Sequence, residues 1–275
     1  MTSLPPERRS YVIGKFGQVH IREQGYQQQA SIPLLLVHQT PWSSLQYLRT
    51  APLLAAGGFH TIAPDSPGYG LSDPPQTALT LTDYADNLAI VLDKLGLARA
   101  AIAGHHTGAM IALIFAARYP DRTLAVVTDN APFYTPEERT ERLARAPQAY
   151  PLKPDGSHFT DRWSLMRRIS DPEMSNEMVN LAVLTFFNNE LIKGSEKDLG
   201  HAAAFQHDLA ADLPAISAPT LIIASRNDPI FASGRRLTAM RPDFAYQEFP
   251  GGTATVLESP QLWAKTIGAF ITANN

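Results

Sequence analysis

Short apolar runs alternate with amphipathic segments over the first half of the chain. Residues 34–37 (LLLV) form a continuous apolar run, which is typical of a strand buried on both faces of a sheet. Residues 82–95 carry apolar side chains at helical spacing and are followed by Gly96, a common residue after a helix. Strands and helices that alternate at such intervals predict a parallel sheet with right-handed crossovers.

The same patterns predict the order of elements along the whole chain. Strands are expected at residues 11–13 and 18–22 (an antiparallel hairpin), 34–37, 60–65, 100–103, 124–127, 220–224 and, with weaker strand character, 244–249. Helices are expected at residues 82–95, 108–119, 136–146, 161–169, 175–192 and 195–213, with a last helix after Pro260. No strand run interrupts residues 131–215, so we interpret them as a helical cap inserted into an α/β core of residues 1–130 and 216–275.

Composition narrows the classes of function. The 275 residues include 23 Lys+Arg and 26 Asp+Glu, and a net charge of -3 gives no electrostatic reason to expect nucleic acid or an anionic membrane as partner. Zero cysteines exclude disulfides, a thiol nucleophile and cysteine metal sites. The N-terminal residues have no apolar signal-like region, and no apolar run reaches 18 residues, so we expect a cytoplasmic protein.

The segment of residues 103–108 (AGHHTG) lies between an expected strand and an expected helix. A sharp strand-to-helix turn needs small residues two positions before and two positions after its apex, because larger side chains would collide there. Gly104 and Gly108 meet that requirement and leave His106 at the apex. An imidazole in this position is a candidate for acid–base chemistry.

Three further segments follow expected strands: residues 37–44 (VHQTPWSS), 64–73 (PDSPGYGLSD) and 225–229 (SRNDP). With the glycine-flanked turn, their order and spacing resemble the α/β-hydrolase superfamily over nearly the whole chain. The first is similar to its oxyanion loop, the second to its Asp-x-x-Gly-x-Gly-x-Ser turn, and residues 258–260 to the Glu-x-Pro that opens its final helix. The resemblance implies a mostly parallel central sheet flanked by helices, with a helical cap insertion.

Departures from the family pattern decide the expected chemistry. The family nucleophile is Ser, Asp or Cys, whereas His106 stands at the apex of this turn. The family's catalytic His lies five positions before the Glu of Glu-x-Pro, and here that position is Thr253. Asp228 matches the family acid, while Gln39 replaces the usual Gly of the oxyanion loop. Two members of the usual triad are therefore missing, and a hydroxyl-nucleophile mechanism cannot run as written.

The remaining groups still support a reaction. The resemblance implies that the backbone N–H groups of Thr40 and Thr107 form an oxyanion hole, and such groups survive changes of side chain. We hypothesise that the His106 imidazole extends toward the space of the missing histidine and contacts Asp228, directly or through Thr253 or a water. That arrangement supplies an acid or base facing an oxyanion hole, as proton transfer beside a carbonyl requires.

Several residues have alternative interpretations. His106 could be a relict position or, less plausibly, a nucleophile, and Asp228 could merely cap the turn before Pro229. Asp129 follows a core strand and is a secondary candidate for the acid. His105 is expected to pack and hydrogen-bond, His38 to brace the oxyanion loop, and Asp65 to hold the glycine-rich turn.

A zinc site formed by His38, His105 and His106 is a further alternative. We disfavour it because adjacent imidazoles at a tight turn should point in different directions, and we expect neither a metal nor another cofactor. Apolar and aromatic residues of the cap suggest a small apolar or aromatic ligand, although most of them should form the cap's own core. The candidate pocket residues are His38, Gln39, Trp42, Asp129, Trp163, Phe186, Phe205, His207 and Thr253.

These observations predict a cofactor-independent enzyme acting on a small, largely apolar carbonyl compound. The reaction could be proton transfer, lyase-type cleavage, cyclisation or a hydrolysis without a serine nucleophile. A first alternative is a non-catalytic protein that binds a small molecule in the same pocket. A second is an ordinary ester hydrolase with an unrecognised nucleophile such as Ser43 or Ser66.

Overall fold

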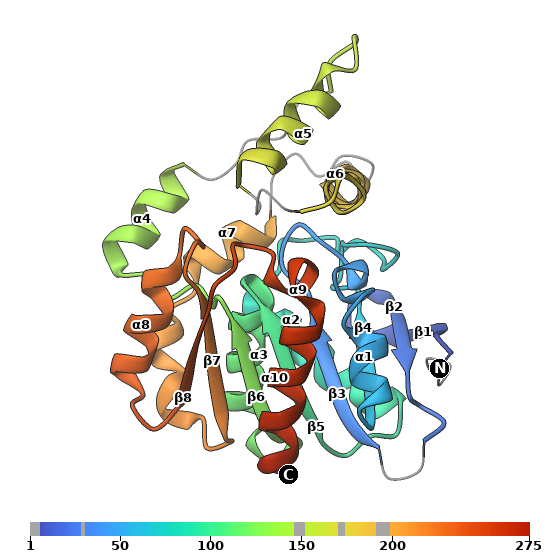
Figure 1. The fold of residues 1–275 in the computed structure, drawn as a ribbon, viewed down its shortest axis with the longest axis vertical. Coiled ribbons are helices and arrows are strands. Elements are labelled where there is room, and N and C mark those ends of the chain that lie inside the picture. Colours follow the sequence, from blue (N-terminus) through green and yellow to red (C-terminus); the bar gives the residue numbers. More distant parts are fainter. Residues whose placement is uncertain (1–5, 29–30, 146–151, 170–173, 191–198) are drawn as a thin grey trace.

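The structure is a computed structural model that describes residues 6–28, 31–145, 152–169, 174–190 and 199–275. An eight-stranded sheet crosses its centre in the order β1-β2-β4-β3-β5-β6-β7-β8 (Figure 1). β2 pairs in antiparallel fashion with both β1 and β4, and the remaining pairs are parallel. The strands are β1 (Arg8–Gly14), β2 (Gly17–Gln24), β3 (Ile32–Val37), β4 (Phe59–Pro64), β5 (Ala100–His105), β6 (Thr123–Asp129), β7 (Thr220–Ser225) and β8 (Ala245–Phe249).

Helices cover both faces of the sheet, and a helical insertion between β6 and β7 lies over one end of it (Figure 1). The insertion contains α4 (Pro136–Ala144), α5 (Ser157–Ile169), α6 (Asn176–Glu190) and α7 (Leu199–Gln206). The other helices are α1 (Ala51–Ala56), α2 (Leu81–Lys94), α3 (Thr107–Arg118), α8 (Phe231–Met240), α9 (Thr255–Glu258) and α10 (Pro260–Ala273). No helix in the described part of the chain is long and apolar enough to cross a membrane.

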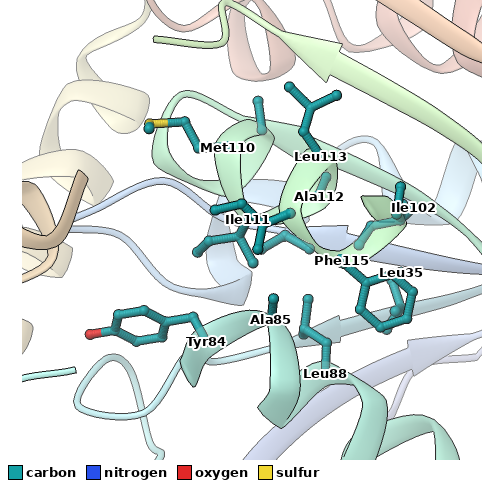
Figure 2. Packing of buried hydrophobic residues seen from close by; sticks show 14 of the residues in the cluster. Leu35, Tyr84, Ala85, Leu88, Ile102, Met110, Ile111, Ala112, Leu113 and Phe115 are labelled. Carbon is teal, nitrogen blue, oxygen red and sulfur yellow. The ribbon is translucent and has the colours of Figure 1, made fainter. Parts of the chain in front are cut away.

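The alternating side chains of β3 divide the core into two layers. Leu35 and Val37 pack with α2 and α3 on one face, where side chains of the two helices interdigitate (Figure 2). Leu34 and Leu36 pack with α1 and α10 on the other face, around the fully buried Trp263. Burial on both faces explains why the apolar run of β3 is continuous. The expected fold, a mostly parallel sheet with flanking helices and a helical insertion, is confirmed.

One expected helix was too long, and three α-helices were missed. The helix expected at residues 195–213 ends at Gln206 in the structure, and two short 3-10 turns, Leu209–Ala211 and Leu213–Ala215, follow it. A side-chain hydrogen bond of 2.6 Å between His207 Nε2 and Asp212 Oδ2 spans the first of these turns and competes with helical continuation. The first residues of the helix expected at 195–213 lie outside the described residues. So do the last residues of the helices expected at 136–146 and 175–192. The sequence patterns also missed α1, α8 and α9, which are short or weakly amphipathic.

Candidate functional site

His106 occupies a strained turn between β5 and α3. Its φ of 47° and ψ of -117° lie in a region that favours glycine. A Cβ at position 104 would collide with the backbone of Gly108, and a Cβ at position 108 with the backbone of Val37. The His106 N–H donates to the Asp129 carbonyl at 2.9 Å, which fixes the turn against β6. The two glycines therefore allow the close packing that holds the imidazole at the apex.

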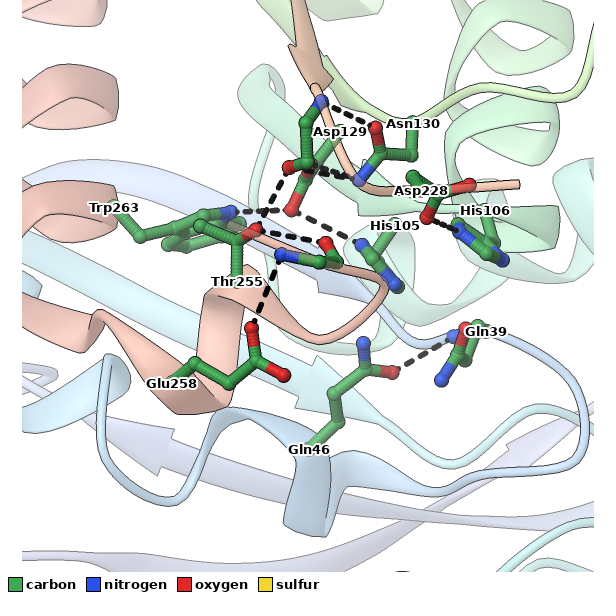
Figure 3. Close-up of polar contacts among 12 residues, drawn as sticks. Gln39, Gln46, His105, His106, Asp129, Asn130, Asp228, Thr255, Glu258 and Trp263 are labelled. Carbon is green, nitrogen blue, oxygen red and sulfur yellow. Dashed lines mark hydrogen bonds and ion pairs between the residues drawn. The ribbon is translucent and has the colours of Figure 1, made fainter. Parts of the chain in front are cut away.

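The His106 imidazole contacts the acid at the end of β7 directly. Nε2 of His106 lies 2.8 Å from Oδ2 of Asp228, although 122 residues separate them in sequence (Figure 3). The other oxygen of Asp228 accepts a hydrogen bond of 2.8 Å from the Ile230 N–H. The His106 side chain is 23% exposed, whereas that of Asp228 is fully buried. Neither Thr253 nor a water is needed to connect the pair.

Protonation of this pair follows from its surroundings. Burial lowers the pKa of His106 below its ordinary value, and the charge on His105 lowers it further, while Asp228 opposes both effects. Burial alone would raise the pKa of Asp228, but its hydrogen bond and attraction to His106 hold that pKa below the ordinary value. The ionised carboxylate accepts a hydrogen bond from Nε2–H. The neutral imidazole therefore keeps a lone pair on Nδ1, which can act as a base. Within the described residues, Nδ1 makes no hydrogen bond.

A second His–Asp pair lies immediately beneath the first. Asp129 Oδ2 accepts hydrogen bonds from His105 Nδ1 at 3.0 Å and from Trp263 Nε1 at 2.9 Å, and Oδ1 accepts one from Asn130 Nδ2 at 3.0 Å (Figure 3). All of these groups are buried. Burial disfavours a charge on His105, but the carboxylates of Asp129 and Asp228 raise its pKa above the ordinary value. Asp129 is thus bound within the core, and it meets His106 through its backbone carbonyl.

The two adjacent imidazoles stack on each other, with ring centroids 4.3 Å apart and planes 14° from parallel. Our expectation that they would point in different directions was therefore wrong. Because His106 lies in the strained turn, its ring folds back over that of His105. The two rings nevertheless bind separate carboxylates, and the described ranges contain no group of three His, Cys, Asp or Glu residues that could hold a metal ion.

The loop after β3, the expected oxyanion loop, is braced by His38. Nε2 of His38 accepts from the Ser66 N–H at 2.9 Å, so Nδ1 carries the proton and donates to the Gln39 carbonyl at 2.8 Å. Burial lowers the pKa of His38, although Asp65 opposes this, and the neutral tautomer is the one that both hydrogen bonds require. The Gln39 N–H donates to Gln46 Oε1 at 2.9 Å, and Figure 3 shows both residues. His38 and Gln39 therefore fix the loop's shape.

The backbone N–H groups of Thr40 and Thr107 have no protein acceptor among the described residues. Thr107 is the first residue of α3, where an N–H has no partner within the helix. Helix α7 of the insertion lies directly over the loop, because a Cβ at Gly200 would collide with the side chains of Thr40 and Tyr69. Both N–H groups are thus available to a ligand oxygen beneath the insertion.

The loop before α9, where the family usually has its histidine, has a structural role here. The backbone of Thr253 lies against His105 and contributes to the raised pKa of that imidazole. Ser225 Oγ and Thr255 Oγ1 are 2.7 Å apart, and Thr255 Oγ1 donates to the Gly252 carbonyl at 3.1 Å. Glu258 Oε2 accepts a hydrogen bond from the Gly252 N–H at 3.4 Å. These contacts tie the loop to the end of β7 and leave the direct His106–Asp228 contact unobstructed.

The other candidate pocket residues divide by location. Trp42 is buried in the core layer that includes α10, and Trp163 and Phe186 pack partly buried against the same layer. The Arg162 guanidinium lies 3.5 Å from the centre of the Phe186 ring. Phe205 packs edge-on against Tyr134, and His207 is held by Asp212. Ligand contact by these side chains stays a prediction.

The sequence analysis missed Tyr134, five residues after the end of β6. The Arg142 guanidinium lies 4.4 Å from the centre of its ring. Burial raises the pKa of Tyr134, Arg142 opposes this, and the charge of Asp228 contributes to the increase. Its hydroxyl makes no hydrogen bond within the described residues. The available signal was an aromatic residue shortly after a core strand, at the start of the insertion.

Comparison with known proteins agrees with the fold. Residues 32–260 match the family model described as alpha/beta hydrolase fold. A protein of Mesorhizobium japonicum, 2-(acetamidomethylene)succinate hydrolase, is 26% identical over 267 residues, which are 93% of this chain and 92% of that protein. The enol-lactonase of Burkholderia xenovorans LB400 superposes with a TM-score of 0.78 at 22% identity, over 96% of this chain and 100% of the other. A structure of E-2-(acetamidomethylene)succinate hydrolase gives a TM-score of 0.74 at 23% identity, over 97% and 100%.

Proposed function

The chain belongs to the α/β-hydrolase family, and we propose that it hydrolyses a small, largely apolar carbonyl compound with His106 as general base. The contact of 2.8 Å between His106 Nε2 and Asp228 Oδ2 carries this proposal, because it leaves Nδ1 as the basic nitrogen. In the usual serine mechanism the acid holds the imidazole through Nδ1, and Nε2 acts as the base. Here the two nitrogens exchange roles, since the imidazole comes from the opposite side of the site.

In the proposed reaction, Nδ1 of His106 removes a proton from a water molecule while the water oxygen attacks the carbonyl carbon of the substrate. The carbonyl π electrons move onto its oxygen, and the N–H groups of Thr40 and Thr107 stabilise the resulting oxyanion. The oxyanion then reforms the carbonyl and expels the leaving group, which takes the proton back from Nδ1. The products are a carboxylic acid and an alcohol, enol or amine, and no group other than water is consumed.

Asp228 orients the base and stabilises the imidazolium that forms during the attack. Its buried carboxylate accepts a hydrogen bond from Nε2–H throughout the reaction, so the positive charge on the ring develops beside a fixed negative charge. Residues 131–215 act in this proposal as a cap that limits access of bulk water. The tight fit of Gly200 against Thr40 and Tyr69 supports that role.

Hydrolysis is favoured over the other reactions that the same base could perform. The relative that matches 93% of this chain is named a hydrolase. Proton transfer, lyase-type cleavage and cyclisation use the same Nδ1 base and oxyanion hole but lack such support. The steps written above need neither a metal nor an organic cofactor.

The test compares hydrolysis of small esters such as p-nitrophenyl acetate by the wild type, His106→Ala, His106→Gln and Ser43→Ala. Removing the base should lower kcat/KM by about 10²–10⁴-fold in both His106 variants, whereas Ser43→Ala should retain the rate. Ester cleavage that persists in the His106 variants would contradict the proposal. Labelling by a serine-directed fluorophosphonate at Ser43 or Ser66 would instead identify an ordinary ester hydrolase, and binding without any turnover would identify a non-catalytic protein.

A further inference from the structure

A second cavity lies on the β2 side of the sheet, between the core and the insertion. Its volume is about 520 Å³, which is within the range of small-molecule pockets. Side chains from β2 and from the turn after β4 form its floor, and α5 and α6 of the insertion cover it; Figure 1 shows α6 above this side of the sheet. Strands β4 and β3 separate β2 from β5, at whose end His106 stands. None of His106, Asp228, Thr40 and Thr107 lines the cavity.

Three large apolar side chains at this cavity are exposed to solvent. Leu71 of the glycine-rich turn is 58% exposed, Leu184 of α6 is 51% exposed, and Phe159 of α5 is 45% exposed. They come from three separate segments, each of which lines the cavity. Exposed apolar side chains that gather around one cavity are typical of a binding site. Single exposed apolar residues, by contrast, are common on protein surfaces.

The cavity also has a His–Asp pair in its wall. Nδ1 of His20 lies 2.8 Å from Oδ2 of Asp65, whose two oxygens also accept hydrogen bonds from the N–H groups of Ser44 at 2.6 Å and Leu71 at 2.9 Å. Burial alone would raise the pKa of Asp65, but these hydrogen bonds and the nearby His38 hold that pKa below its ordinary value. The ionised Asp65 therefore accepts a hydrogen bond from Nδ1–H of His20, and in that tautomer Nε2 is an acceptor.

Two buried polar atoms of the lining have no hydrogen-bond partner within the described part of the chain. They are Nε2 of His20, a residue 2% exposed, and Oγ1 of Thr185, a residue 4% exposed. An unpaired buried polar group costs free energy, so such atoms are uncommon in a protein interior. Both residues line this one cavity. A bound molecule with a hydroxyl group would satisfy the acceptor on His20 and offer a partner to Thr185.

We propose that this cavity is a second binding site, for a small and largely apolar molecule whose hydroxyl group donates to His20 Nε2. Leu71, Phe159 and Leu184 enclose the apolar part of that molecule. Both polar atoms are shielded from solvent, so binding in this proposal includes a change of side-chain rotamers in the cavity lining, a rapid motion for exposed residues. The site is independent of the proposed hydrolysis, because it shares no residue with the His106–Asp228 pair.

The test measures calorimetric binding of 2-naphthol and of its methyl ether, which has the same apolar body but cannot donate a hydrogen bond. The wild type should bind 2-naphthol about two- to tenfold more tightly than the ether, as expected for one hydrogen bond. His20→Asn keeps a donor to Asp65 and removes Nε2, so it should abolish the preference for 2-naphthol. Thr185→Val, which preserves the shape of Thr185, should reduce that preference if the fold tolerates it.

Variants at the rim locate the site. Leu184→Arg should weaken binding of both probes at least tenfold, because a charged group would enter the apolar cavity. Leu152→Arg changes another exposed leucine of the insertion, one that does not line this cavity, and should leave both affinities unchanged. His106→Ala should also bind both probes like the wild type. Failure to bind 2-naphthol, equal binding of the two probes, or loss of binding in His106→Ala in place of Leu184→Arg would each overturn the proposal.

Discussion

Two His–Asp pairs stand side by side at the end of β5, and they differ in almost every physical respect. His105 and Asp129 are fully buried, and Asp129 accepts three side-chain hydrogen bonds. His106 is 23% exposed, and Asp228 receives a hydrogen bond from its side chain. The carboxylates of Asp129 and Asp228 raise the pKa of His105 against the effect of burial, whereas burial and the charge on His105 lower the pKa of His106. Sequence neighbours thus acquire opposite protonation preferences from their surroundings.

The difference assigns the two pairs different tasks. His105, with its raised pKa, belongs to the buried hydrogen-bond network that stabilises the core beneath the turn. A neutral His106 at the solvent-accessible apex retains a basic nitrogen, which general-base catalysis requires. Because the rings stack at 4.3 Å, the charge on the first also influences the second. The pairs can be separated experimentally by substitutions that affect only one of them.

Substitution of each carboxylate by its amide gives the sharpest contrast. Asp228→Asn should lower the rate of ester hydrolysis by about 10²–10⁴-fold, because the amide no longer stabilises a positive imidazole, and should change the free energy of unfolding by at most about 1.5 kcal/mol. Asp129→Asn should lower the free energy of unfolding by about 3–5 kcal/mol, because an N–H₂ group would face buried donors. Urea denaturation and initial rates measure both quantities. Equal effects of the two variants on stability would contradict the division of tasks.

The strained turn under His106 gives a smaller, measurable effect. His106→Gly should be more stable than His106→Ala by about 1–2 kcal/mol in thermal or urea unfolding, because only glycine adopts a φ of 47° without strain. The matched control is Glu141 on the exposed surface of α4, where the order should reverse and Ala should be favoured by about 1 kcal/mol. If both positions favour alanine, the turn is not strained.

The stacked rings predict a change in the pH dependence of the rate. The wild-type rate should fall as pH decreases through the lowered pKa of His106, so the midpoint of the acid limb lies below the ordinary histidine value. His105→Asn keeps a donor for Asp129 but removes the neighbouring charge, which should move that midpoint to higher pH. His60→Gln, at the remote pair with Glu23, serves as control and should leave the profile in place. A shift to lower pH in His105→Asn would refute the coupling.

Stability should also depend on pH through His105. The pKa of His105 is raised in the folded protein, so the folded state binds its proton more tightly than the unfolded state does. Its contribution is therefore fully present below the unfolded pKa and is lost as pH rises through the folded pKa. The difference in unfolding free energy between the wild type and His105→Asn should shrink as pH rises through that range, by no more than about 1.5 kcal/mol. A difference that grows with pH would show that His105 is neutral in the folded state.

Much of the fold could be read from local patterns. Each of the eight strands has a counterpart in the apolar runs, because strands buried in a parallel sheet need continuous hydrophobicity. Short helices were harder to detect: α1 has only six residues, and α8 carries polar residues around a small buried face. The helix expected at 195–213 was overextended, because its periodicity does not reveal the hydrogen bond between His207 and Asp212.

The candidate site was only partly readable. Gly104, Gly108 and the apical His106 could be identified because they lie within one short segment. The stacking of His105 on His106 was missed, since it depends on the backbone dihedrals at the apex. Tyr134 was missed for a different reason: its relation to Asp228 depends on how the insertion folds back over the sheet.

The sequence by itself determined that a sharp turn presents a histidine at the end of a core strand. Local sterics are sufficient for that, because a Cβ at position 104 or 108 would collide with backbone atoms. Only the tertiary structure decided which carboxylate each imidazole binds, which nitrogen remains basic and which of the two rings has the raised pKa. Those properties depend on burial and on charges 24 and 122 residues away in sequence, which approach only when β6 pairs with β5 and β7 pairs with β6.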